Sequence, residues 1–204
     1  MNQEHRQVHL GFTEEQFPAA THMCYIFSDE NERRRIISAF MARGANDGEK
    51  IGYFADRISP DELCSCLREQ GVDTDALTAS GQLFVDMAER VYCPDQCFCS
   101  RRMLETLRSN YLQARDAGFT GFRASGEMDW ALAGESDRLR ELLWYESQVN
   151  DVVDAHPITA ICQYDARKFD GAVLHRILEV HPYMVVRGQV VRNPYYIVPS
   201  ELSL

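Results

Sequence analysis

The chain has 204 residues, a size that favours one domain with a buried central sheet. Hydrophobic residues make up 45% and charged residues 25%, as in ordinary globular proteins. The formal net charge of -10 disfavours contact with phosphate backbones, so we expect no direct binding of nucleic acid. No apolar run is long enough to cross a bilayer, and residues 1–16 lack the pattern of a signal peptide. The sequence therefore predicts a cytoplasmic protein without membrane contact.

The order of elements predicts one domain over residues 21–204, preceded by a flexible N-terminal arm over residues 1–20. The clearest helix start is Ser59, followed by a proline and by a glutamate placed for a capping box. Strands are expected over residues 22–27, 50–55, 82–87, 121–125, 158–164 and 183–187, with short strands over 189–192 and 195–198. Helices are expected from residue 31, from 59 to 71, from 100 to 117, from 136, and from 170 to 180.

This repeated β-then-α order predicts the α/β class, with a mainly parallel sheet flanked by helices on both faces. The tail after Gly188 is expected to add antiparallel edge strands. In such folds ligands bind beyond the carboxyl ends of the strands. The turn after the first strand, Ser28 to Glu32, carries three acids and no glycine, and no P-loop motif occurs in the chain. A phosphate loop needs glycines and a lysine, so we expect no nucleotide there.

Polar side chains follow the fourth and fifth strands. Glu127, Asp129 and Trp130 come after strand four, where two carboxylates beside an indole ring could bind a polar or cationic ligand. The alternative is a solvated loop that the tryptophan anchors to the core. Gln163 and Asp165 end strand five and share one side of it, at the same rim.

A third cluster lies on the helix that begins near residue 136. Glu146 and Asn150 fall on its apolar stripe, and a buried carboxylate is costly unless it is paired. Arg123, within strand four, is the expected partner, and a structural pair that holds helix to sheet is the alternative to a ligand site. The residues expected to line one ligand pocket at the carboxyl edge are Glu127, Trp130, Glu146 and Gln163.

The seven cysteines are an odd number in a chain without an export signal, so reduced thiols are expected. Cys24 and Cys162 lie within strands and are predicted to be buried and inert. Cys93, Cys97 and Cys99 precede a helix, and the sequence does not decide whether they bind metal or sense oxidation. Their spacing does not match ordinary zinc sites, and His156 and His181 are placed to cap helix ends, so no metal site is predicted.

Several short motifs follow one another in a fixed order over about residues 20–199. They are His22-Met23-Cys24, Gly48-Glu49-Lys50, Gly81-Gln82-Leu83, Gly126 to Leu132, Tyr145-Glu146 with Asn150, Cys162 to Asp165, Phe169 with Gly171, His181-Pro182, and Asn193 to Tyr196. In this order the motifs resemble the MEDS domains, a sensory family named for methanogens, methylotrophs and a dichloromethane-responsive regulator. The resemblance implies a RecA/ATPase-like core that lacks the P-loop, and a sensory role often found beside DNA-binding or histidine-kinase-like modules.

We therefore predict a small-ligand-sensing regulatory domain without catalytic activity. Because the chain ends at Leu204 with no output module, we expect it to act through a partner regulatory protein in signalling or transcription control, with homodimer formation as a further option. Two alternatives stay open: a small-molecule enzyme that uses Glu127 and Asp129 as acid and base, and a thiol-based redox or metal sensor. The sequence identifies neither the ligand nor a cofactor. The candidate ligand-binding residues are Glu127, Asp129, Trp130, Glu146, Asn150, Gln163 and Asp165.

Overall fold

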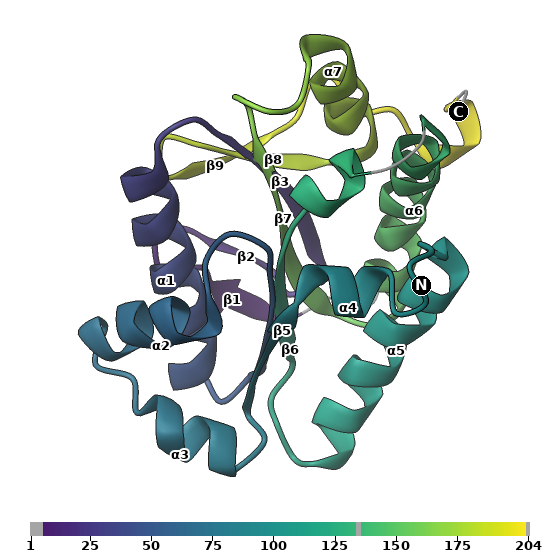
Figure 1. The fold of residues 1–204 in the computed structure, drawn as a ribbon. Coiled ribbons are helices and arrows are strands. Elements are labelled where there is room, and N and C mark those ends of the chain that lie inside the picture. The colour runs from purple at the N-terminus through teal and green to yellow at the C-terminus, as the bar shows by residue number, and fades with distance from the viewer. Residues whose placement is uncertain (1–5, 134–135, 203–204) are drawn as a thin grey trace.

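The computed structural model describes residues 6–133 and 136–202, and Figure 1 shows their path. No helix in these ranges combines the length and the apolarity that crossing a membrane requires. The elements, in chain order, are β1 (Gln7–His9), β2 (Gln16–Pro18), β3 (Thr21–Phe27), α1 (Glu30–Asn46), β4 (Lys50–Ala55), α2 (Pro60–Glu69), α3 (Thr74–Ala79), β5 (Leu83–Met87), α4 (Ala88–Tyr92), α5 (Ser100–Asp116), β6 (Phe122–Glu127), η1 (Asp129–Leu132), α6 (Ser136–Ala155), β7 (Ile158–Asp165), α7 (Gly171–Val180), β8 (Tyr183–Val186), β9 (Gln189–Arg192) and η2 (Pro199–Glu201).

The main sheet has seven strands in the order β5-β4-β6-β7-β3-β8-β9. Neighbours from β5 to β8 pair in parallel, and β9 pairs antiparallel with β8. The predicted α/β class is therefore confirmed, and so is the antiparallel edge after Gly188. All the carboxyl ends of the parallel strands meet at one rim, which we call the carboxyl edge.

Helices cover both faces of the sheet, with α1 and α2 on one side and α4, α5 and α6 on the other (Figure 1). Successive residues of a strand point to opposite faces, so each central strand contributes to two cores. In β7, for example, Ile161 packs into the core beside α1, whereas Ala160 and Cys162 pack into the core beside α6. The parity of a residue in its strand thus decides which face its side chain joins.

Local capping fixes the helix that follows the first long strand. Only Ser28 and Asp29 separate β3 from α1, and the Asp29 side chain accepts from the backbone N–H groups of Asn31 (2.8 Å) and Glu32 (3.1 Å). The capping box predicted at Ser59 is also present, closed by the Glu62 side chain. Short-range sequence signals therefore place both helix starts within a residue of their positions.

Residues 6–20 form an antiparallel pair of short strands, where the sequence suggested a flexible arm. Val8, Leu10 and Phe17 are buried against the core beside α1, and the Arg123 guanidinium donates to the His9 carbonyl (Nη2–O 3.0 Å). Strands of three residues carry too few alternating positions for periodicity to reveal them. The remaining expected arm, residues 1–5, lies outside the described part of the chain.

Two further regions differ from the prediction. Residues 195–198 form no strand; the Asn193 side chain accepts from the Tyr195 N–H (3.0 Å) and turns the chain instead. The short helices α3 and α4 fall in segments where no helix was predicted, because five or six residues do not establish a helical period. Neither difference alters the order of the main strands.

Candidate functional site

Glu127 and Gln163 face each other at the carboxyl edge, as register partners at the ends of β6 and β7. The Glu127 carboxylate accepts from the Tyr53 hydroxyl (2.5 Å) and from the Arg57 backbone N–H (2.5 Å), and it pairs with Arg33 (Nη1–Oε1 3.1 Å). Arg33 is fully buried and also donates to the side-chain amide oxygen of Gln163 (Nη1–Oε1 3.0 Å). We call Arg33, Tyr53, Glu127 and Gln163 the edge network, and its acceptors are already occupied within the chain.

Asp165 forms a more open ion cluster beside the edge network. Its side chain is buried, and it accepts from Arg57 (Nη1–Oδ2 2.8 Å) and Arg167 (Nε–Oδ1 2.7 Å), each of which is about half exposed. Hydrogen bonds from Arg167 outweigh burial and lower the pKa of Asp165 to about 2. Asp129 forms an ion pair with Lys168 close by. The carboxylates of Glu127, Asp129 and Asp165 therefore each have a cationic partner.

Trp130 belongs to a different environment, the core beside α6. Its ring stacks on Tyr92 at 4.6 Å between centroids and lies 4.7 Å from the ring of Phe98. Only 2% of Trp130 is exposed. These contacts favour the alternative in which the tryptophan anchors the turn after β6 to the core.

Glu146 is fully buried, as its helical spacing predicted, but its partner is not Arg123. Arg123 sits on the α1 face of β6 and pairs with Glu49 (Nε–Oε2 2.5 Å), whereas Glu146 lies on the α6 face. The Glu146 Oε1 atom accepts from the Tyr164 hydroxyl (2.7 Å), and Oε2 faces the imidazole of His22 (Nε2–Oε2 3.1 Å). The expected pairing failed because sequence alone did not show which face of the sheet α6 covers.

The predicted single pocket is thus divided between the two faces of the sheet. Glu127, Gln163 and Asp165 come together on the α1 face. On the α6 face, Glu146 and Asn150 both contact His22 (Asn150 Oδ1–His22 Nδ1 3.0 Å). Neither His22 nor His181 was predicted as a partner of Glu146, because both lie far from it in the chain.

A cavity of about 340 Å³ opens where β3 and β8 part. The two strands pair only at Met23–Tyr183 and Cys24–Met184, so the residues beyond these pairs diverge and leave space. We call it the β3–β8 cavity. The hydroxyl of Tyr25, one of its lining residues, is buried and has no hydrogen-bond partner among the residues that the structure describes. The cavity is lined by Cys24, Tyr25, Ile26, Phe27, Ser28, Glu32, Met184, Val185, Val186 and Arg187.

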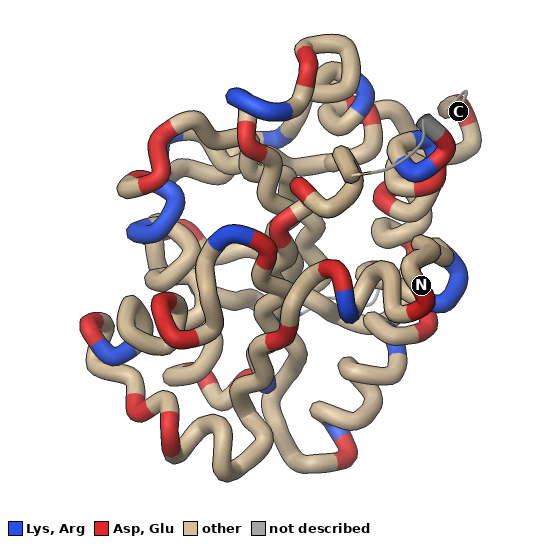
Figure 2. Tube along the Cα trace, viewed as in Figure 1, with Lys and Arg blue, Asp and Glu red and all other residues tan. Residues whose placement is uncertain are grey.

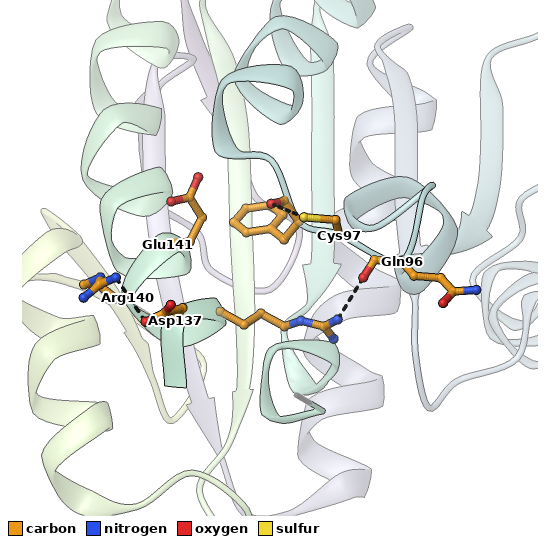
Figure 3. Close-up of a pocket in the computed structure, with 7 residues that line it drawn as sticks. Gln96, Cys97, Asp137, Arg140 and Glu141 are labelled. Atoms are coloured by element: carbon orange, nitrogen blue, oxygen red, sulfur yellow. Dashed lines mark hydrogen bonds and ion pairs between the residues drawn. The ribbon is translucent and has the colours of Figure 1, made fainter. Parts of the chain in front are cut away.

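A second cavity, of about 520 Å³, lies beside Cys97 and the start of α6. Figure 3 shows that Arg140 reaches Asp137 and that the Gln96 backbone accepts from a guanidinium, so much of the polar lining is already paired. All seven thiols are free. Cys24 and Cys162 are buried as predicted, and of the three cysteines before α5, Cys93 is buried while Cys97 and Cys99 are exposed.

The turn that would carry a phosphate loop is filled by the chain itself. The Asp29 carboxylate caps the first amides of α1, which are the groups that bind anions at helix starts. Glu30 and Glu32 add negative charge in the same turn. The turn therefore presents carboxylates where a phosphate loop would present free amides and a lysine.

We expect no magnesium-dependent ATP hydrolysis by the purified chain, because the Asp29 carboxylate takes the place of a phosphate group. Phosphate release should equal that of buffer at any protein concentration. Turnover that follows the protein peak through stringent purification, and is lost in Glu127→Gln, would contradict this expectation.

The fold and the edge network define an α/β domain of the RecA type whose phosphate turn is closed. Two solved structures from Pyrococcus horikoshii share the fold. A KaiC-like protein, PH0186, matches with a TM-score of 0.62 and 15% identity, over 88% of this chain and 79% of that one. The uncharacterized protein PH0321, in complex with an unknown peptide, matches with a TM-score of 0.61 and 13% identity, over 81% and 76%. At these identities the likeness concerns the fold alone.

The model of the MEDS family, described as the methanogen/methylotroph, DcmR sensory domain, matches residues 21–182. The chain belongs to this family, and the resemblance seen in the sequence is confirmed. The transcriptional repressor DcmR of Methylorubrum extorquens is 26% identical over 161 residues, which are 78% of this chain and 57% of DcmR. The chain thus spans little more than half the length of that regulator. Family and relative together define a sensory, regulatory class of protein.

Proposed function

We propose that this chain is a small-ligand-sensing regulatory domain whose ligand occupies the β3–β8 cavity and whose output passes to a partner protein. The observation that carries the proposal is the Tyr25 hydroxyl, which is buried and unpartnered. Leaving a buried hydroxyl unpaired costs free energy, which a ligand with a hydrogen-bonding group would recover.

The lining of the cavity indicates the class of ligand. Ile26, Phe27, Met184 and Val185 supply apolar walls, and the volume of about 340 Å³ lies at the small end of ligand sites. A small, mainly apolar molecule with one polar group fits this combination. Such a molecule would also be excluded from the edge network, whose acceptors are occupied within the chain.

The cavity is connected to the edge network through Phe27. The Arg33 guanidinium lies over the Phe27 ring at 4.9 Å, and Arg33 holds both Glu127 and Gln163. A ligand that displaces Phe27 would therefore act on Arg33, and through it on the start of α1. These contacts run without a break from the cavity to the edge network and to α1, and packed contacts of this kind can transmit coupling between sites.

The same contacts weigh against the alternative of an acid–base enzyme. Glu127 is held by Arg33, Tyr53 and a backbone amide, and Asp129 is paired with Lys168. An acid–base pair needs a free proton-transfer position within reach of a substrate. Both carboxylates instead have structural partners, which supports a binding role.

The charge distribution supports a protein partner over nucleic acid. Basic residues are scattered over several elements and stand beside acidic ones in Figure 2. Within the basic run of α1, Arg33 is buried, and Arg34 pairs with Glu62 (Nη2–Oε1 3.3 Å). Seven free thiols are typical of a reducing compartment, so we place this function in the cytoplasm.

Tyr25→Phe tests the ligand site. Because the hydroxyl has no partner, the melting temperature without ligand should stay the same or rise. Binding of any compound that stabilises the wild type should weaken by about three- to tenfold, the value of one hydrogen bond. Thermal shift against small C1 and halogenated compounds measures this, with the exposed Tyr195→Phe as a control that leaves binding unchanged.

Two results would count against the proposal. In one, no compound of the panel stabilises the wild type. In the other, stabilising compounds bind Tyr25→Phe as tightly as the wild type, which would place them outside the β3–β8 cavity.

A further inference from the structure

Four side chains from four separate segments converge in the core beside α6. His22 comes from β3, Glu146 from α6, Cys162 from β7, and His181 from the residue that follows α7. All four are buried, and one ligand atom from each lies within 4.8 Å of the others. We propose that these four residues, the HECH cluster, bind one transition-metal ion with zinc-like preferences.

The tautomer of His22 is fixed by its neighbour Asn150. The Asn150 amide nitrogen donates to the carbonyls of Val180 (3.0 Å) and Ser147 (3.3 Å), so its oxygen must face His22. That oxygen lies 3.0 Å from His22 Nδ1, which therefore carries the proton. The Nε2 lone pair of the neutral ring is left facing Glu146 and Cys162.

His181 is oriented in the same way. Its Nδ1 donates to the Ile177 carbonyl at 2.7 Å, and a carbonyl can only accept. Its Nε2 is fully buried, lies 3.5 Å from Glu146 Oε2, and has no hydrogen-bond partner within residues 6–133 and 136–202. Metal-binding histidines characteristically donate their other ring nitrogen to such a carbonyl or amide oxygen.

Two nitrogen lone pairs and a carboxylate oxygen thus face one another in the core. Such an arrangement is repulsive and costly to bury unless a cation lies between the groups. The Cys162 thiol donates to Glu146 Oε2 (Sγ–Oε2 3.4 Å), and a further proton could bridge His22 and Glu146, but neither proton reaches His181 Nε2. Burial and the neighbouring His181 lower the pKa of His22, which favours the neutral ring that a metal ion requires.

Three of the separations lie near the edges of a tetrahedral site, and all the ligand atoms lie within 4.8 Å of one another. Bonds of 2.0–2.3 Å to nitrogen, oxygen and sulfur give edges of about 3.3–3.6 Å between ligand atoms. His22 Nε2 lies 3.1 Å from Glu146 Oε2 and 3.4 Å from Cys162 Sγ, and His181 Nε2 lies 3.5 Å from Glu146 Oε2. The set of two imidazoles, one carboxylate and one thiol is of the kind that zinc accepts.

The site would be closed and therefore not catalytic. Four protein ligands complete a tetrahedron, and buried structural zinc sites have this character. Burial and the charge of Glu146 raise the pKa of the Cys162 thiol well above its ordinary value, so the thiol stays protonated until a metal ion displaces the proton. Binding would then tie β3, α6, β7 and the end of α7 together. The inference does not depend on the β3–β8 cavity being the ligand site.

The test begins with the purified full chain. Elemental analysis should find about one zinc-type ion per chain. After removal by a chelator, Co²⁺ should restore about one ion per chain and give the visible spectrum of a tetrahedral site with a thiolate-to-cobalt band. Neither measurement requires a mutation, so neither depends on a variant that folds poorly.

Variants then assign the ligands. Cys162→Ser should remove the thiolate-to-cobalt band, whereas Cys24→Ser, the matched buried cysteine opposite it in β3, should retain that band. Asn150→Ala, which releases His22 without removing a ligand, should weaken metal affinity by about 10–100-fold. Replacing Cys93, Cys97 and Cys99 together by serine should leave the metal content unchanged.

The inference is overturned if the folded wild-type chain neither contains a metal ion nor binds Co²⁺ or Zn²⁺. It is equally overturned if metal binds but the thiolate-to-cobalt band survives Cys162→Ser and disappears with the three cysteines before α5.

Discussion

Glu146→Ala should lower the free energy of unfolding by about 3–5 kcal/mol when measured in the presence of a chelator. The substitution leaves the hydroxyl of Tyr164 and the imidazole of His22 without their buried partner. Removing one member of a buried polar pair costs far more than the pair contributes, because the remaining member cannot reach water. Denaturant unfolding monitored by circular dichroism measures the change.

A matched control lies on the same helix. Asp151 is exposed, so Asp151→Ala should change the free energy of unfolding by less than about 0.5 kcal/mol. Glu146→Gln should fall between the two, since an amide can still accept from Tyr164 and can donate to an imidazole lone pair. If Glu146→Ala is as mild as Asp151→Ala, the contacts of Glu146 contribute nothing to stability.

The contact between Glu146 and His22 predicts that the stability of the protein falls at acidic pH. Burial alone would raise the pKa of Glu146. In the metal-free chain, protonation of His181 and His22 at Nε2 would let both rings donate to this carboxylate, which outweighs burial and holds the pKa of Glu146 well below its usual range. Stability that depends on this carboxylate is therefore complete above the ordinary glutamate pKa of about 4.3 and is lost as pH falls through the lower native pKa. His22, whose native pKa is lowered by burial, adds a loss that begins as pH falls below about 6.5.

For Glu146, the sequence predicted burial correctly but predicted the wrong partner. Its helical spacing with the apolar residues of α6 correctly predicted burial, because periodicity reports which face of a helix is inward. Its partner was predicted incorrectly, because Arg123 is an odd-numbered residue of β6 and points to the α1 face. Strand parity was available from the sequence, but the side of the sheet that each helix covers was not.

The sequence predicted contacts between neighbouring strand ends, but it did not predict contacts that depend on which helix packs on which face of the sheet. Gln163 and Glu127 were correctly placed at one edge, since both end parallel strands. The HECH cluster was missed because its members are brought together only by tertiary packing, with His22 and His181 at opposite ends of the domain sequence. His181 was predicted to cap a helix end, and its Nδ1 does donate to the Ile177 carbonyl. Its other ring nitrogen, Nε2, is the atom that we propose as a metal ligand.

Arg123→Met should be about as damaging as Glu146→Ala, at about 3–5 kcal/mol. Arg123 is fully buried and pairs with Glu49, which is also buried. Its remaining guanidinium nitrogens donate to the carbonyls of Phe40 (2.9 Å) and His9 (3.0 Å). Methionine fills much of the space but leaves the Glu49 carboxylate and two carbonyls without these donors.

Loss of the contact between Arg123 and His9 should make Arg123→Met locally detectable by hydrogen exchange. Because Arg123 fastens β1 to the sheet, hydrogen exchange at residues 7–18 should accelerate more than exchange in β7. Gly44→Ala should reproduce the effect in milder form, since a Cβ there would lie 2.6 Å from the Arg123 Cδ atom. Arg43→Met removes a half-exposed pair with Asp47 and should cost less than about 1 kcal/mol.

A double variant separates charge from packing. Arg123→Met combined with Glu49→Met removes both buried charges, and replacement of a whole buried pair by apolar groups is often neutral. Much of the stability lost in Arg123→Met should therefore return, although Arg6 loses its contact with Glu49. If the double variant is as unstable as the sum of the two single variants, Arg123 acts through its bonds to the His9 and Phe40 carbonyls, and the ion pair itself contributes little.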